Sequence, residues 1–139
     1  MPLVFSPFKT MNLSAHKKPL DFNELLNRCL GEVEFAQKIL RDFLQTTRPL
    51  LDEIGNALMD YSGNQAAFKV HRLKGTAGLV AANPLLETLV ELENMLRRAS
   101  EIPQSHLSVC LDRSYRRFDE VQRFAEMHLL DPSRMEPLS

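Results

Sequence analysis

His71 is the residue of this chain best placed to do chemistry, because small residues surround it on one face of a predicted helix. At about 100° per residue, the small residues within about 40° of His71 are Gly75, Gly78 and Ala82. Lys74 stands one turn away. The apolar residues of the segment fall on the opposite side and predict its buried stripe: Ala66, Val70, Leu73, Ala77 and Val80. A glycine inside a helix costs about 0.5–1 kcal/mol relative to alanine, so two glycines beside one imidazole indicate a surface that a bulky partner approaches.

Basic side chains gather around this histidine in the sequence. From Tyr61 to Leu86 the chain has no aspartate or glutamate, and its three basic residues are Lys69, Arg72 and Lys74. The window therefore carries +3 in a chain whose formal charge is −1, which leaves −4 for the remainder. A local positive field beside an exposed nucleophile indicates an anionic partner or a transferred anion.

Phosphoryl transfer is the chemistry that fits these residue types. Imidazole is largely unprotonated near neutral pH and takes up a phosphoryl group as a nucleophile without an activating base. The product carries about two negative charges, which Lys74 can offset in part. The face of His71 offers no carboxylate to hold Mg²⁺, and the chain has no Walker-type glycine loop. The transfer would therefore take its metal and its acidic groups from a partner.

Helices must position this histidine, because helical periodicity dominates residues 21–130 and no strand-like alternation persists. The chain has 23 leucines against ten valines and isoleucines together, which favours helix over sheet. Residues 61–64 are expected to form a turn. The expected helices cover residues 21–30, 32–60 and 65–82, then one opens at Asn83-Pro84 with an asparagine cap, and one opens at Pro103. Short connections between long helices predict an all-α, up-down antiparallel four-helix bundle with a short additional N-terminal helix.

The longest expected helix contains Pro49, which should kink it without ending it, since the apolar pattern resumes in phase. Its expected inner stripe is Phe35, Ile39, Phe43, Leu50, Leu51, Ile54 and Leu58. The bundle is expected to span residues 21–130. Residues 1–20 are expected to form a flexible arm or linker, and residues 131–139 a loose C-terminal tail.

Composition excludes several classes of protein. Cys29 and Cys110 are too few and too far apart for a disulfide framework or a zinc knuckle, and we interpret them as buried free thiols. No apolar run approaches the ~20 residues of a membrane span, and the first residues lack the apolar core of a signal peptide. We therefore expect a cytoplasmic protein without direct membrane insertion.

The run from His71 to Gly78, His-Arg-Leu-Lys-Gly-Thr-Ala-Gly, resembles the signature of histidine-containing phosphotransfer (HPt) domains. That signature is a histidine, any residue, an apolar residue, lysine, glycine and then small residues. The resemblance extends over about residues 21–128, which is the predicted bundle itself. One position departs from the family pattern. The family usually has glycine ten residues after the histidine, where this chain has Ala81, and we expect a local packing adjustment there.

The resemblance implies a phosphoryl carrier without kinase activity of its own. His71 would be the phosphoacceptor, attacking through Nε2, and Lys74 would neutralise the phosphoryl oxygens. The surface that docks the receiver domain would comprise Gly75, Gly78, Phe68, Arg72 and Ala82. The implied partners are response-regulator receiver domains and a histidine kinase or hybrid kinase, with Mg²⁺ on the receiver. The chain would have no cofactor of its own, would bind no nucleic acid and would be a monomer.

Other classes fit the residues less well. A di-iron bundle needs Glu-x-x-His pairs, and no histidine of this chain has a glutamate three residues before it. A nucleic-acid adaptor is disfavoured because the arginines of the last helix alternate with acids. In the dimerisation domain of histidine kinases an acid usually follows the histidine and a proline stands five residues on, where this chain has Arg72 and Thr76. The open alternative is a helical interaction module that binds receiver domains without phosphorylation, although such a module normally loses the histidine.

Overall fold

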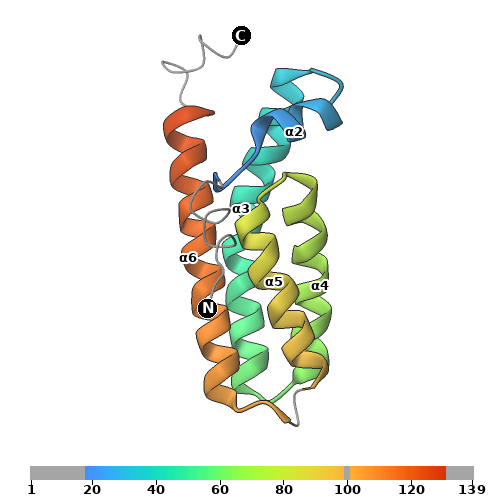
Figure 1. Cartoon of the computed structure of the whole chain (residues 1–139), viewed down its shortest axis with the longest axis vertical. Helices are drawn as coiled ribbons and strands as arrows, with labels where there is room; N and C mark the ends of the chain where they lie inside the picture. Colours follow the sequence, from blue (N-terminus) through green and yellow to red (C-terminus); the bar gives the residue numbers. More distant parts are fainter. Residues whose placement is uncertain (1–17, 99–100, 131–139) are drawn as a thin grey trace, which may run out of the picture.

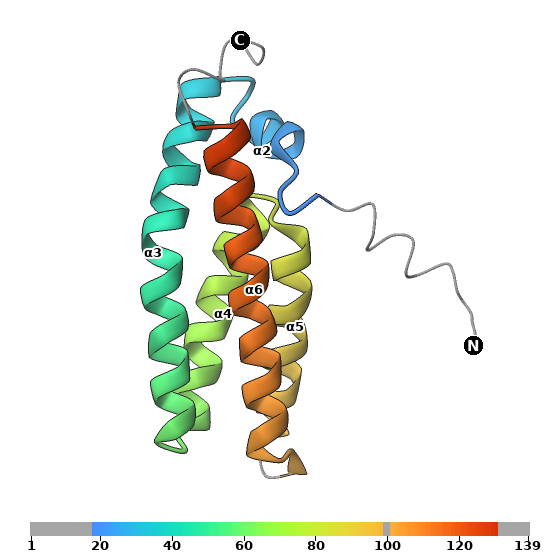
Figure 2. The same cartoon turned by 90° about the vertical axis from the view of Figure 1, so that its left-hand side faces the viewer.

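Every regular element is a helix in the part of the chain that the computed structural model describes, residues 18–98 and 101–130. The elements are α2 (Phe22–Arg28), α3 (Val33–Met59), α4 (Gly63–Leu79), α5 (Asn83–Arg97) and α6 (Gln104–His128). The four long helices alternate in direction, and each packs mainly against two neighbours, so they close into a bundle with α2 across one end (Figures 1 and 2). The predicted all-α four-helix bundle with a short N-terminal helix is confirmed. None of the described helices is long and apolar enough to cross a bilayer.

The ends of α4 and α5 differ from the prediction by a few residues. α4 begins at Gly63 and ends at Leu79, three residues before the expected end, because Ala81 adopts a left-handed φ of 61°. α5 begins at Asn83 itself with Ala82 at the N-cap, so the expected asparagine cap is wrong. The proline of Asn83-Pro84 does lie in the first turn, where a missing N–H needs no acceptor.

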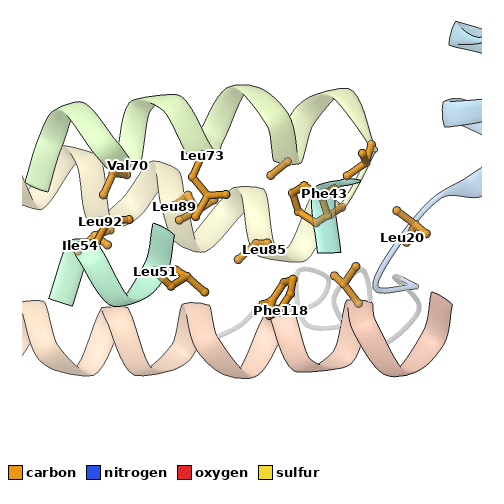
Figure 3. Packing of buried hydrophobic residues seen from close by; sticks show 14 of the residues in the cluster. Leu20, Phe43, Leu51, Ile54, Val70, Leu73, Leu85, Leu89, Leu92 and Phe118 are labelled. Atoms are coloured by element: carbon orange, nitrogen blue, oxygen red, sulfur yellow. The ribbon is translucent and has the colours of Figure 1, made fainter. Parts of the chain in front are cut away.

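The core lies between the four long helices and holds α4 in place (Figure 3). Phe43 and Phe118 meet edge to face, with ring centroids 6.2 Å apart. Each large apolar side chain that is fully removed from water contributes about 1.5–3 kcal/mol. The fully buried side chains of the core include Leu40, Leu51, Ile54, Val70, Leu73, Leu85, Leu89, Leu92 and Phe118.

Two expectations about the ends of the bundle are wrong. Phe35 is 53% exposed, because the first turn of α3 extends beyond the ends of α4 and α5 (Figure 1). Leu20, which the sequence placed in the arm, is fully buried, and the next residue, Asp21, donates its N–H to the carbonyl of Ala81 at 3.0 Å. The bundle therefore begins no later than Leu20. The rest of the expected arm, residues 1–17, and the expected tail, residues 131–139, lie outside the described residues. α3 continues through Pro49, as predicted.

Candidate functional site

His71 lies on the outer face of α4, and its side chain is 67% exposed. The predicted stripe on the opposite side of the helix is confirmed, since every one of its members is buried: Ala66, Val70, Leu73, Ala77 and Val80. Gly75 is exposed one turn from the imidazole, and a Cβ placed on it would meet no described atom outside its own helix within 4 Å. The small residue therefore leaves open space beside the imidazole.

A buried carboxylate from α5 supports the imidazole from behind. Glu93 is only 5% exposed, and its Oε2 lies 3.0 Å from Nδ1 of His71 while its Oε1 lies 2.6 Å from Nζ of Lys74. Arg97, one turn further along α5, approaches the same Oε2 at 3.7 Å. This carboxylate could not be found from the residues of α4, because it comes from the neighbouring helix. One signal could have found it: Glu93 falls about 40° from Leu89, inside the apolar stripe of its helix.

Glu93 determines which nitrogen of His71 carries the proton. The hydrogen bond from Lys74 lowers the pKa of the Glu93 carboxyl, and the hydrogen bond from His71 and the charges of Lys74 and Arg97 lower it further, against the effect of burial. An ionised carboxylate only accepts hydrogen bonds, so Nδ1 of the neutral ring donates its N–H to Oε2. Nε2 of the neutral ring is then left with a lone pair, which is the form of the ring that can act as a nucleophile.

One protein family matches this chain. The Hpt domain family model matches residues 38–124, which is more than half of the chain. The chain belongs to the Hpt domain family. No curated protein and no solved structure gives a significant match. Hpt domains act in histidine phosphotransfer in two-component phosphorelays, and they interact with receiver domains and histidine kinases. The matched segment begins within α3 and does not include α2.

The charges around the site of this Hpt domain are largely paired. Lys74 binds Glu93 of α5, and Nζ of Lys69 lies 3.0 Å from Oε1 of Glu53 of α3. Of the three basic residues in the positive window of the sequence, Arg72 is the one without an ion pair to any described residue. The charge of +3 is therefore a property of the segment and not of the surface, because the neighbouring helices supply acids.

The outer face of α4 carries two of the expected docking residues. Phe68 is 64% exposed, and Arg72 is exposed beside it. Leu79, which was not among the expected docking residues, is 46% exposed on the same face. Its position on the helix, about 80° from His71, lies close to that of Phe68 at about 60° and could have been found from the same geometry.

Two other expected docking residues are less accessible. Gly78 is half-buried, and a Cβ placed on it would lie 3.9 Å from Cδ2 of Leu86 on α5. Ala82 is fully buried, so the prediction that it shares the surface of His71 is wrong. The prediction assumed that the helix continues to residue 82, whereas α4 ends at Leu79.

Ala81 stands where Hpt domains usually have glycine. Its φ of 61° lies in the left-handed region, which costs an L-residue about 1–2 kcal/mol. The residue is fully buried, and its N–H donates to the carbonyl of Gly78 at 3.1 Å. The glycine of the family pattern thus fits the backbone conformation of this turn. The consequence of alanine is strain in the turn, where we expected a packing adjustment.

Among the described residues, no group of three or more histidine, cysteine, aspartate or glutamate side chains is arranged to hold a metal ion.

Proposed function

We propose that Nε2 of His71 accepts a phosphoryl group from the phospho-aspartate of a receiver domain, or from a kinase, and passes it to the aspartate of a response-regulator receiver. The observation that carries this proposal is the 3.0 Å contact between Nδ1 of His71 and Oε2 of Glu93, because it keeps a lone pair on Nε2. The lone pair attacks phosphorus, the bond between phosphorus and the aspartate oxygen breaks, and the aspartate leaves as a carboxylate.

Glu93 stabilises the charge that develops on the ring. As Nε2 bonds to phosphorus, the imidazole keeps its Nδ1 proton and gains positive charge. The ionised carboxylate at 3.0 Å is already in place to stabilise that charge, so no group has to reorganise at the moment of reaction. Transfer to the next receiver reverses the step and returns the ring to its neutral form.

Lys74 has donors for both the carboxylate and the phosphoryl group. Its ammonium group has three N–H donors, of which one is used by Glu93 at 2.6 Å. The side chain is 28% exposed, so the remaining donors can reach a phosphoryl oxygen on the neighbouring ring. Mg²⁺, in this proposal, is bound by the receiver and offsets phosphoryl charge there, and this chain acts as a monomer.

The receiver domain docks over the side of α4 that faces α3. Phe68 and Leu79 are exposed on that side of His71, whereas the ion pairs with α5 lie on the other. A standard interface of about 800 Å² per partner has a radius of about 16 Å, and Leu79 lies about 12 Å from His71 along the helix. A groove of about 410 Å³ between α3 and α4, lined in part by Leu50 and Arg72, continues this surface.

The test of the proposal is phosphoryl transfer from a phosphorylated receiver domain. The wild-type chain is expected to acquire an acid-labile, alkali-stable label, which His71→Gln loses. His106→Gln, which changes an exposed histidine on α6, is the matched control and is expected to keep the label. Label on His71→Gln, or none on the wild type, would overturn the assignment. A wild-type chain that binds the receiver without acquiring label would establish the alternative, an interaction module without phosphorylation.

Gly75 provides a test of access to the imidazole. Gly75→Leu is expected to slow transfer from the receiver while the helical content stays intact, because the added side chain occupies open space where the receiver must approach. Gly75→Ala is the graded control and is expected to transfer at a rate close to that of the wild type. Circular dichroism checks the fold, and the initial rate of labelling checks access. A wild-type rate for Gly75→Leu would show that the open surface plays no part.

A further inference from the structure

Arg28, the last residue of α2, contacts the C-terminal end of the phosphoacceptor helix α4. Its NH1 donates to the carbonyl of Leu79 at 3.0 Å and also to the carbonyl of Gly78. Its NH2 pairs with the carboxylate of Glu24 on α2, so both sides of the guanidinium are engaged. One guanidinium therefore joins the ends of two helices that are about 50 residues apart in the sequence.

Arg28 adds to the hydrogen bonds that close the end of α4, where the N–H groups of residues 80–82 already reach the carbonyls of residues 76–78. Carbonyl groups in the last turn of a helix have no partner within the helix and need donors from elsewhere. The last turn of α4 has no basic residue of its own, and it contains Gly78, which weakens a helix by about 0.5–1 kcal/mol relative to alanine. The turn that follows is strained at Ala81. Arg28 donates to the carbonyl of Leu79, adds a second donor to the carbonyl of Gly78, which already accepts the N–H of Ala81, and places a positive charge at the negative end of the helix dipole.

This last turn belongs to the surface proposed to dock the receiver. Leu79 lies within the footprint of a receiver centred on His71. Its side chain is exposed, so its position depends on the backbone of the last turn being held in place. The chemical groups at the centre are held separately, since Glu93 reaches His71 from α5. Arg28 is thus placed to affect recognition of the receiver and not the transfer step.

We propose that Arg28 is a positioning residue for receiver recognition, which holds the last turn of α4 in the form that the receiver binds. The inference rests on the proposed function. It assigns a role to α2, an element that lies outside the segment matched by the family model.

The experiment compares Arg28→Gln with Arg116→Gln, a matched control that changes an exposed arginine on α6. Transfer from a phosphorylated receiver is measured as a function of receiver concentration. Arg28→Gln is expected to raise KM about three- to tenfold, the effect of losing a charge-assisted bond that is partly exposed to water, with the rate at saturation within about twofold of the wild type. Arg28→Lys, which keeps the charge and can donate to one carbonyl, is expected to recover part of the KM, and Arg116→Gln to match the wild type.

A partner-free reaction separates this inference from the proposed function. Phosphoramidate, a small phosphoryl donor, is expected to label His71 of Arg28→Gln at the wild-type rate, because no docking surface is needed. If neither the receiver nor phosphoramidate labels the wild type, the proposed function fails. If the wild type is labelled and Arg28→Gln has the KM of Arg116→Gln, the role of Arg28 is refuted. A fall in labelling by phosphoramidate, or in the rate at saturation with KM unchanged, also refutes it, because either would show a general effect on the fold or on the chemistry.

Discussion

Replacing Glu93 by glutamine keeps the size of the side chain and removes its charge, so it tests how the imidazole is activated. In the wild type, the carboxylate accepts hydrogen bonds from both Nδ1 of His71 and Nζ of Lys74. A glutamine amide can still accept one of these bonds through its oxygen. Its NH₂ group, however, can donate to Nδ1, and that arrangement moves the ring proton to Nε2, where it blocks the attack.

The size of the effect follows from the bond at 3.0 Å. A hydrogen bond to a charged group contributes about 1.5–3 kcal/mol, and a neutral one about 0.5–1.5 kcal/mol. The difference of about 1–1.5 kcal/mol corresponds to a rate lower by roughly tenfold, since 1.36 kcal/mol is a factor of ten. Loss of a negative charge near the incoming phosphoryl group would by itself raise the rate, because it removes a repulsion. Lys74, at 2.6 Å, already neutralises much of that charge, so the effect on the ring decides the sign.

The assay is the initial rate at which His71 acquires label from a saturating phosphorylated receiver. Glu93→Gln is expected to react about tenfold more slowly than the wild type, for the reason just given. Glu91→Gln is the matched control, because Glu91 is on the same helix but is exposed and pairs with Arg113 at 2.8 Å. Its rate is expected to equal that of the wild type. Circular dichroism confirms that both variants are folded.

A Glu93→Gln variant that reacts as fast as the wild type or faster would refute this role of Glu93. An equal rate would mean that the carboxylate does not set the tautomer of His71. A faster rate would mean that its main effect is repulsion of the phosphoryl group. A slower rate in Glu91→Gln as well would show that the effect does not depend on the contact between Glu93 and His71.

Three further predictions concern stability and reactivity. Ala81→Gly is expected to raise the free energy of unfolding by about 1 kcal/mol, measured by urea denaturation, because glycine adopts φ 61° without strain; a decrease would contradict this. Because the pKa of Glu93 is lowered in the folded state, its ionisation contributes stability above its ordinary value of 4.5 and this contribution is lost as the pH falls through the folded pKa. The difference in unfolding free energy between wild type and Glu93→Gln should therefore shrink at acid pH, and a constant difference would count against the paired carboxylate. Burial raises the pKa of the Cys110 thiol to about 11, so this thiol should resist iodoacetamide in the folded protein at pH 8. The free energy of unfolding should fall between about pH 9 and 11, because the thiol ionises first in the unfolded chain. Rapid alkylation of Cys110 would refute its burial.

The helices and the orientation of His71 could be predicted from the sequence because both depend on local periodicity. The stripe opposite His71 is buried as expected, and this alone places the imidazole on the outer face of α4. The prediction was wrong where periodicity continues but the packing does not. Phe35 keeps the phase of its helix, yet it lies in a first turn that α4 and α5 do not reach. Ala82 keeps the phase of α4, but the backbone leaves the helix at Ala81.

The partners of the functional side chains could not be predicted in the same way, because they come from other helices. Glu53 reaches Lys69 from α3 across 16 positions of sequence, and Glu93 reaches His71 from α5 across 22. A charge count along one segment takes no account of such contacts. It therefore predicted a positive surface, whereas Lys69 and Lys74 form ion pairs with acids of the neighbouring helices. Only the relative rotation of packed helices decides which acid meets which base.

The position of Glu93 within its own helix is an argument for its function. It lies beside Leu89 in the buried stripe of α5, where an apolar side chain would not carry the cost of removing a charge from water. A buried ion pair is about neutral for stability when compared with well-packed apolar side chains, because desolvation offsets the attraction between the charges. Packing therefore does not require a carboxylate at this position. The carboxylate does hold the proton of the neutral His71 ring on Nδ1, and Lys74 keeps that carboxylate ionised and in place although it is buried.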